Sequence, residues 1–409
     1  MRNRGSCFTL CFVPVETPRP ECPAPAAAPT VELHRHFEAG LAPDTIARLA
    51  QRHGVTAARN RAGRMIEGVD PQDPESIRHY YRTVSEGFSL PDGAARFIGS
   101  FGLPLSVMQT LEDLEYAAFT QLVDCAAAGS LHTELRGSPF TYREHVDAPI
   151  DEIAEALVRG VQRAWDERAV SGTFILAFSR QKGLPGTDAS VPEGQAVPVA
   201  RLAARLHRPD RPVGLDIAGF PERPFPPGLF EDALRPAREA GVPLTIHAGE
   251  QGRPPAFAEA PPDTILEAVD RLGALRIGHG TSLAGSAAAR ARLRDRGICV
   301  ECCPVSNDRM GFMPLADHPL RLFLEEGLRA TVSTDDPLMF GPMTVGETMA
   351  AIAGPLGLDH THLVLLTRNA IDAAFVTNER RAILHARLGM YAAPGLKSRG
   401  YVPHVDLRT

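Results

Sequence analysis

Residues 31–40 read VELHRHFEAG, a short apolar run that ends in two histidines and an acid. Alternate side chains of a β-strand point to the same face, so a strand here directs His34 and His36 to one place. Glu38 follows two residues later. A strand that ends in polar side chains is typical of an α/β fold whose active site lies at the strand ends. The H-x-H pattern alone also fits two ordinary histidines, so the rest of the chain decides.

Seven further apolar runs alternate with amphipathic helical patterns, which is the signature of repeated βα units and a parallel sheet. With the first run, the predicted strands are residues 30–36, 130–137, 173–180, 212–219, 243–250, 275–280, 297–304 and 329–337. Eight strands in βα order favour a closed (β/α)8 TIM barrel over an open sheet. The long gap at residues 41–129 predicts a helical insertion after the first strand, placed as a lid over the barrel mouth. Helical patterns after the last strand predict extra C-terminal helices.

The chain of 409 residues suits one barrel domain, predicted over residues 30–395. Residues 1–29 are rich in proline and alanine and predict a disordered or non-native extension, and residues 396–409 predict a C-terminal tail. A net charge of −6 without a basic stripe argues against nucleic acid as a partner. No apolar run has the length of a membrane span. Seven cysteines form no paired framework, which indicates reduced thiols and a cytoplasmic location.

Polar residues gather where the predicted strands end, and in a TIM barrel these ends meet at one face. The residues are His34, His36, Glu38, Asp216, Gly219, His247, Glu250, His279, Ser306, Asn307, Asp335 and Asp336. Each alone has an ordinary explanation, such as a core histidine, a helix cap or a tight turn. Together they bring so many ionisable groups to one face that burying them is costly unless they pair or bind a metal.

Three neutral imidazoles and one carboxylate form a ligand set suited to zinc or a similar transition metal. A catalytic metal leaves one position open for water and lowers the pKa of that water until hydroxide forms near neutral pH. The remaining acids and imidazole are then available for proton transfer and for orienting a substrate. The sequence therefore predicts a one-metal hydrolytic site at the barrel mouth.

Five separated motifs resemble those of the adenosine deaminase family, in the order of that family. They are VELHRHFEAG, TIHAGE, RIGHGT, ECCPVSN and VSTDDPLMFG, and the resemblance extends from about residue 29 to about residue 390. It implies a zinc-dependent purine deaminase on a (β/α)8 barrel, with one zinc ion per chain. The implied reaction is hydrolytic deamination of a small 6-aminopurine nucleoside, adenosine or deoxyadenosine, to inosine or deoxyinosine and ammonia by a metal-activated hydroxide.

The resemblance also implies a role for each matching residue. The implied metal ligands are His34, His36, His247 and Asp335, with His36 also beside the substrate. Glu250 would protonate purine N1, and His279 would orient or deprotonate the attacking water. The implied substrate contacts are Asp336 at N7, the backbone of Gly219 at N3, and Glu38 at the ribose. Hydroxide attack at C6 needs an acid at N1, so Glu250 is expected to have a raised pKa.

The stretch HRHFEAG departs from the H-x-H-L-D-G common in the family, with Glu38 as the acid and Ala39 in place of glycine. The stretch GFPERPFPPGLF, residues 219–230, departs as well. Both are expected to lie where the substrate extends beyond the purine. Alternative substrates are therefore adenine, 6-aminodeoxyfutalosine or another modified adenine nucleoside. Neither a monomer nor a homo-oligomer is favoured.

Three other functions are less consistent with the sequence. A two-metal amidohydrolase needs a bridging modified lysine, and Lys182, the one lysine near a strand end, lies past the third strand. A cytidine-type deaminase needs P-C-x-x-C after an H-x-E, and only the H-x-E of His132 and Glu134 is present, so these two residues are expected to line the barrel or its lid. A non-catalytic metal-binding relative would have lost a ligand or Glu250.

Overall fold

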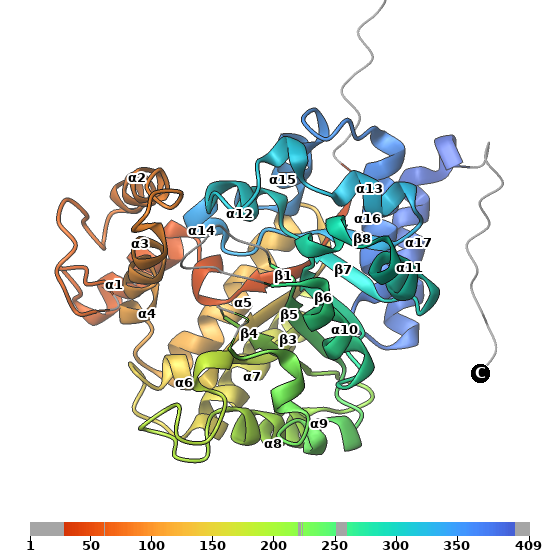
Figure 1. The fold of residues 1–409 in the computed structure, drawn as a ribbon. Coiled ribbons are helices and arrows are strands. Elements are labelled where there is room, and N and C mark those ends of the chain that lie inside the picture. The colour runs from red at the N-terminus through yellow and green to blue at the C-terminus, as the bar shows by residue number, and fades with distance from the viewer. Residues whose placement is uncertain (1–27, 61, 220–221, 223, 251–259, 397–409) are drawn as a thin grey trace, which may run out of the picture.

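Eight parallel strands form one sheet in chain order in the computed structural model (Figure 1). The structure describes residues 28–60, 62–219, 222, 224–250 and 260–396. The strands are β1 (Thr30–His36), β2 (Ser130–Gly137), β3 (Gly172–Ser179), β4 (Gly214–Ala218), β5 (Leu244–Ala248), β6 (Arg276–His279), β7 (Cys299–Cys302) and β8 (Arg329–Val332). All eight predicted strands are confirmed. The later ones are shorter than predicted because the polar residues at their carboxyl ends belong to loops.

The barrel closes between β1 and β8 through one isolated bridge, from Arg35 to Asp335. Its hydrogen bonds run from the N–H of His36 to the carbonyl of Asp335 (2.9 Å) and from the N–H of Asp335 to the carbonyl of His34 (2.9 Å). The Glu32 carboxylate accepts the N–H of the residue before Asp335 (3.0 Å). The β1–β8 seam therefore has few backbone bonds, and it lies among the predicted metal ligands.

The predicted insertion after β1 is helical and lies to one side of the barrel in Figure 1. It consists of η1 (Glu38–Gly40), α1 (Pro43–His53), α2 (Pro74–Ser85), α3 (Gly93–Ser100), α4 (Gly102–Val107) and α5 (Leu111–Ala127). The helix α2 starts at Asp73, whose side chain accepts two backbone N–H groups, and α5 starts with a capping box at Thr110. These caps fix where the helices begin.

Helices on the outside of the sheet connect the remaining strands. They are α6 (Pro139–Tyr142), α7 (Ile150–Arg168), η2 (Arg180–Lys182), α8 (Ala196–Leu206), η3 (Pro227–Phe230), α9 (Arg235–Glu239), α10 (Pro262–Asp270), η4 (Thr281–Gly285), α11 (Ala287–Asp295), α12 (Pro304–Arg309), η5 (Leu315–Asp317) and α13 (Leu320–Glu325). Their apolar faces and the outer face of the sheet form a continuous buried core.

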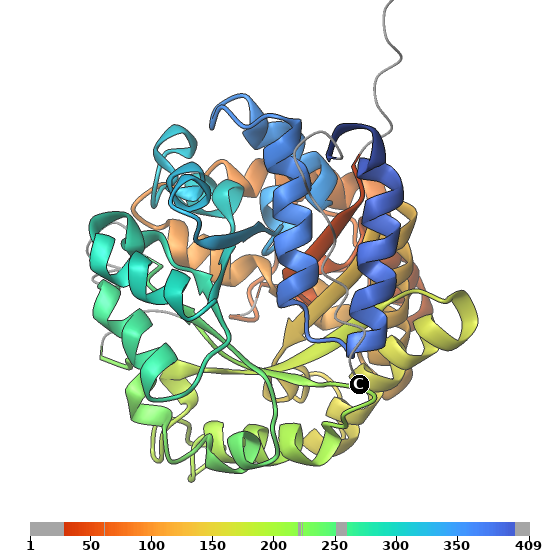
Figure 2. The ribbon, with the colours of Figure 1, turned by 90° about the vertical axis from the view of Figure 1, so that its right-hand side faces the viewer.

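The C-terminal helices are also as predicted. They are α14 (Pro337–Phe340), α15 (Val345–Ala353), α16 (His360–Ala373) and α17 (Asn378–Leu396). The helix α16 packs against both β1 and β8, so it covers the seam of the barrel, and α17 lies beside it (Figure 2). The extension predicted over residues 1–29 lies almost wholly outside the described residues, as does the predicted tail over residues 396–409.

The insertion roofs the barrel mouth, in agreement with its predicted position. Phe97 and Ile98 of α3, with Phe101 after it, line a cavity that also contains the polar residues at the strand ends. The Phe97 ring stacks on Phe340 at a centroid separation of 5.4 Å. These aromatic side chains form one wall of the cavity above the polar groups.

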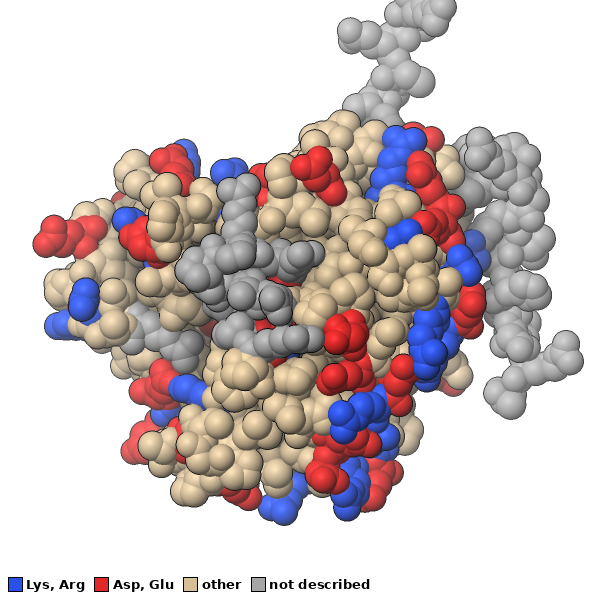
Figure 3. All heavy atoms as spheres, viewed as in Figure 1, with Lys and Arg blue, Asp and Glu red and all other residues tan. Residues whose placement is uncertain are grey.

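Two observations bear on larger partners. Acidic and basic side chains of the described residues are interspersed on the face shown in Figure 3. Within the described ranges, no helix is both long enough and apolar enough to cross a membrane.

Candidate active site

Four of the predicted site residues bring nitrogen and oxygen atoms together at the carboxyl end of the barrel. The Nε2 atom of His247 lies 3.1 Å from Nε2 of His34 and 3.4 Å from Nε2 of His36. Oδ1 of Asp335 lies 3.5 Å from Nε2 of His34 and 3.4 Å from Nε2 of His36. Two atoms bound at about 2.0–2.1 Å to a tetrahedral zinc ion are about 3.3–3.4 Å apart. Four of the six separations within this set are therefore close to those expected between ligands of one metal ion.

The tautomers of two histidines also favour a cation between them. Nδ1 of His34 lies 2.8 Å from Glu301, and Nδ1 of His247 lies 2.9 Å from Asp216. A nitrogen that faces a carboxylate carries the proton, so each Nε2 presents a lone pair. Burial lowers the pKa of His34 well below its usual value, which favours the neutral ring. Two lone pairs that face each other at 3.1 Å repel unless a cation lies between them.

The buried charges behind the histidines also favour a cation at this place. Five side chains that are at most 1% exposed form a chain of ion pairs through the barrel: Glu134, Arg276, Glu301, Arg136 and Asp216. Three carboxylates and two guanidinium groups leave one net negative charge, and the Asp335 carboxylate brings the total to two. A divalent cation at the histidines balances this charge, and buried charge is stable only when balanced.

Other residues also approach this cluster. The ligand atoms of His34, His247, His279 and Asp335 all lie within 4.8 Å of one another, as do those of His36, Asp335 and Asp336. The predicted ligands are therefore split between two groups that share Asp335. Nε2 of His279 lies 3.9 Å from Asp335, farther than the 3.4–3.5 Å of His34 and His36, which suits a neighbour of the ion better than a ligand.

Two of these residues have a backbone conformation that side-chain-bearing residues rarely adopt. His279 has φ +62° and Asp335 has φ +65°. Left-handed backbone costs about 1–3 kcal/mol at such residues and is concentrated at functional sites. Each lies where a strand ends, so the unusual φ turns its side chain toward the barrel axis.

Glu250, His279 and Asn307 form a group beside the cluster. Oε1 of Glu250 lies 3.3 Å from Nδ1 of His279 and accepts a hydrogen bond of 3.3 Å from the Asn307 amide. Burial raises the pKa of Glu250 well above its usual value, and Asp335 and Glu222 raise it further. Burial also lowers the pKa of His279 well below its usual value. An acid whose pKa is raised and an imidazole whose pKa is lowered are thus side by side at the barrel mouth.

The cavity above these groups has a volume of about 380 Å³ and is open to the remaining predicted residues. Glu38, Gly219 and Asp336 line it, together with Glu250 and His279. Burial raises the pKa of Asp336 well above its usual value, with a further contribution from Asp335. Oδ1 of Asp336 is buried and has no hydrogen-bond partner among the described residues. This carboxyl group is therefore available to a ligand in the cavity.

Glu38 also lines the cavity. It is 9% exposed and accepts a hydrogen bond of 2.7 Å from the hydroxyl of Tyr142. Gly219, with φ +87°, lies where β4 ends, and residues 220–221 and 223 of the divergent stretch after it lie outside the described residues. The cavity is therefore lined by all the predicted catalytic and substrate-binding residues and by three of the four predicted metal ligands. The fourth ligand, His34, is fully buried behind them, with its Nε2 atom 3.1 Å from that of His247.

Several residues of the site were not assigned a role by the sequence analysis, which named Asp216 only as one of the polar residues at the strand ends. Arg136, Glu301 and Asp216 support the histidines from inside the barrel, and Glu222 accepts the backbone N–H of Gly249 (2.6 Å) next to Glu250. The signal for the first three was a charged residue inside an otherwise apolar strand, which requires a buried partner. No comparable signal marks Glu222, because it lies in a loop.

The structure also places the residues of the rival functions. Lys182 lines the outer part of the cavity, where its side chain is 44% exposed and lies 3.8 Å from Glu144, away from the histidines. His132 and Glu134 lie inside the barrel, as expected, where Glu134 pairs with Arg276 at 2.5 Å. Neither arrangement supports a bridging lysine or a cytidine-type metal site.

Comparison with known proteins gives consistent results. A family model described as adenosine deaminase matches residues 29–390. An adenine deaminase of Rhodospirillum rubrum is 33% identical over 88% of this chain and 96% of its own length. An adenosine deaminase of Shewanella denitrificans is 28% identical over 88% of this chain and 97% of its own length. The crystal structure of adenine deaminase from Arthrobacter aurescens, 26% identical, superposes with a TM-score of 0.72 over 90% of this chain and all of that one (100%).

Proposed function

The chain belongs to the adenosine deaminase family, and we propose that it hydrolyses the C6 amino group of an adenine-containing substrate, with release of ammonia. The observation that carries the proposal is the approach of His247 Nε2 and Asp335 Oδ1 to Nε2 of both His34 and His36, at 3.1–3.5 Å, beside Glu250, an acid whose pKa burial raises. The test is a panel of 6-aminopurines scored for ammonia release, with metal content measured on the same sample.

We assign one zinc ion to His34, His36, His247 and Asp335. Bound there, zinc supplies a water of lowered pKa, and thus a nucleophile at neutral pH. The protein contributes neutral imidazoles, whose Nδ1 protons are held by Glu301 at His34 and by Asp216 at His247. Aromatic side chains form one wall of the cavity above these groups. The ligand distances and the charge balance support this assignment.

Glu250 acts as the acid in the proposed reaction. Attack at C6 pushes electron density onto N1, and a proton delivered to N1 neutralises it. The raised pKa of Glu250 keeps that proton available near neutral pH. His279, whose pKa is lowered, can orient the attacking water or take a proton from it and pass that proton to the leaving amine. The remaining proton of the C6 hydroxyl returns to Glu250 as ammonia departs and the C6 carbonyl forms, which restores the acid. Asn307 contacts both groups and fixes their spacing.

The purine ring is held by Asp336 and Gly219. N7 of a purine accepts hydrogen bonds, so a carboxyl group at N7 must carry a proton. The raised pKa of Asp336 and its lack of a partner among the described residues both support this role. The backbone at Gly219 faces N3, and Glu38, which also lines the cavity, binds the part of the substrate beyond the ring.

Two substrate classes are proposed. Adenosine or deoxyadenosine is the first, because Glu38 stands where the family binds ribose. Free adenine is the second, because the Rhodospirillum relative at 33% identity and the Arthrobacter structure are both adenine deaminases. The ratio of kcat/KM for adenine to that for adenosine decides between them. A cytoplasmic location is also proposed, and it is supported by the free, buried state of Cys125, Cys299, Cys302 and Cys303.

The proposed acid predicts a basic limb in the pH profile. Glu250 is active when protonated, so kcat/KM is expected to fall tenfold per pH unit once the pH rises above its raised pKa. The measurement is a pH–rate profile with adenosine and adenine as substrates. A rate that stays constant well above neutral pH would contradict the assignment.

Metal removal is expected to abolish turnover and to loosen the β1–β8 seam. A ligand present at about 100 times its Kd stabilises the folded state by roughly 2.7 kcal/mol, so the chelated protein should melt several degrees lower. Hydrogen exchange should increase most at the amides of His36 and Asp335. These two amides donate the backbone hydrogen bonds that join β1 to the segment after β8, and both residues are proposed metal ligands. Added zinc should reverse both changes. Full activity in metal-free protein would refute the proposed mechanism.

A further inference from the structure

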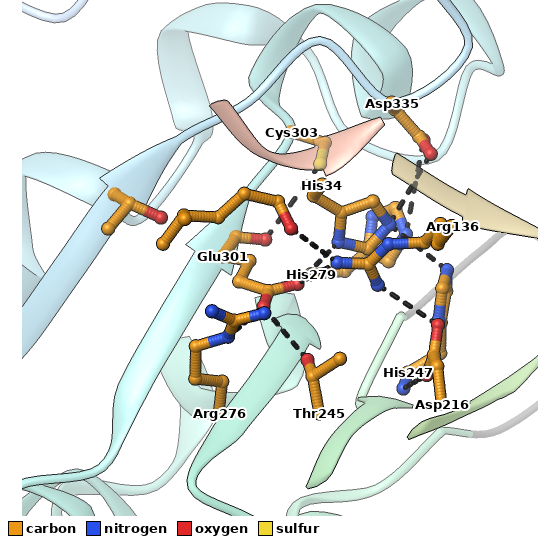
Figure 4. Close-up of polar contacts among 12 residues, drawn as sticks. His34, Arg136, Asp216, Thr245, His247, Arg276, His279, Glu301, Cys303 and Asp335 are labelled. Carbon is orange, nitrogen blue, oxygen red and sulfur yellow. Dashed lines mark hydrogen bonds and ion pairs between the residues drawn. The ribbon is translucent and has the colours of Figure 1, made fainter. Parts of the chain in front are cut away.

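Arg136 lies at the centre of the ion pairs beneath the histidines (Figure 4). It is fully buried on β2, and its guanidinium group donates to three other strands. One nitrogen donates to Oδ2 of Asp216 on β4 (3.0 Å), and the other to Oε2 of Glu301 on β7 (2.7 Å). The second nitrogen also donates to the carbonyl of Leu33, the residue before His34 (2.6 Å).

The same two carboxylate oxygens contact the histidines. Oε2 of Glu301 lies 2.8 Å from Nδ1 of His34, and Oδ2 of Asp216 lies 2.9 Å from Nδ1 of His247. One guanidinium group therefore connects two carboxylate–histidine pairs that belong to different strands. The two histidines are 213 residues apart in sequence, and their Nε2 atoms meet at 3.1 Å.

Building on the proposed metal site, we propose that Arg136 is a positioning residue that holds both histidines in the orientation and tautomer that binds the metal. The guanidinium fork is planar and rigid, so it fixes the angle between the two carboxylates as well as neutralising them. Without it, Asp216 would have no arginine partner in this chain of ion pairs and Glu301 would keep only Arg276, so nothing would hold the two carboxylates at a fixed angle to each other. Each carboxylate could then move away from the Nδ1 atom it contacts, and the histidine ring could rotate.

A second buried arginine, Arg276, differs from Arg136 in the number of histidines that it reaches through a carboxylate. Arg276 also pairs with Glu301, through Nε at 2.6 Å, but its other partner is Glu134, deeper in the barrel. Arg276 thus reaches one histidine through one carboxylate, whereas Arg136 reaches both. Although burial opposes its charge, Glu301 and Asp216 raise the pKa of Arg136 above its usual value. The Arg136 guanidinium group therefore stays charged at every working pH.

The test measures zinc affinity by competition with a chelator in Arg136→Lys and Arg136→Met. Lysine keeps the buried charge, so this variant should fold, but one ammonium group cannot hold both carboxylates in the guanidinium geometry. Loss of an outer partner of a metal-binding histidine typically costs about 10–100-fold in affinity. We expect at least a tenfold loss in Arg136→Lys and a larger one in Arg136→Met.

The control is Arg290→Met, which removes a buried arginine paired with Glu326 (2.8 Å) far from the histidines and should leave zinc affinity unchanged. Nitrogen-15 spectra of the metal-free proteins add a second readout. The wild type should show His34 and His247 protonated at Nδ1, and Arg136→Lys should show mixed tautomers.

If Arg136→Lys has the same zinc affinity and the same histidine tautomers as the wild type, the proposed positioning role of Arg136 is refuted, while the proposed metal site stands. A wild type that binds no zinc would instead refute the proposed metal site.

Discussion

Glu250→Gln is expected to lower kcat by about 10²- to 10⁴-fold while the protein keeps its zinc. Glutamine has nearly the same shape and can accept the hydrogen bond from Asn307, so the local structure should persist. It has no acidic proton, however, and the negative charge that develops at N1 would stay unneutralised. The readouts are single-turnover rates, with adenosine and adenine as substrates, and metal content by mass spectrometry on the same sample.

The matched control is Glu231→Gln, the same change at an acid whose side chain is 42% exposed and pairs with Arg271. It should retain full activity. A near-wild-type rate in Glu250→Gln would remove Glu250 from the acid role. Loss of zinc together with the rate would show that Glu250 supports the metal site.

His247→Ala is expected to lose both zinc and turnover. The Nε2 atom of His247 lies 3.1 and 3.4 Å from those of the other two proposed histidine ligands, so its removal takes away the ligand that approaches both. It also leaves the buried Asp216 carboxylate without its imidazole partner. A metal ion stabilises a hydrolytic transition state by several kcal/mol, and about 4 kcal/mol corresponds to roughly a 10³-fold loss in rate.

A suitable control is His385→Ala, which removes a partly buried histidine paired with Asp372 (2.7 Å) outside the site. It should keep a full equivalent of zinc. The contrast between Glu250→Gln and His247→Ala is the decisive result, because the first separates chemistry from metal binding and the second does not. A His247→Ala protein with stoichiometric zinc and normal turnover would exclude His247 as a ligand.

The local pattern of the chain predicted the barrel and most of its site. Alternation of side chains along a strand placed His34 and His36 on one face before any contact was known. The βα order then brought His247, His279 and Asp335 to the same face, because all parallel strands in a barrel end on one side. This reasoning needs only residue order, and it correctly located the cavity residues.

Only the tertiary structure showed what lies behind the histidines. Periodicity says which side chains share a face of a strand, but it does not say which strands face each other across a barrel. Arg136 was therefore an unexplained charge in a strand until the fold placed it between Asp216 and Glu301. The positive φ of His279 and Asp335 was equally invisible, because neighbouring strands impose it against local preference.

The sequence by itself thus determined the eight strands, the single polar face and the residue types available for chemistry. The tertiary structure decided which nitrogen of each supported histidine carries the proton, how near the ligand atoms approach, and which buried charges balance them. The physical reason is the separation along the chain over which each kind of interaction acts. Strand and helix periodicities act between residues a few positions apart, whereas ion pairs and metal geometry depend on groups that meet from hundreds of residues apart.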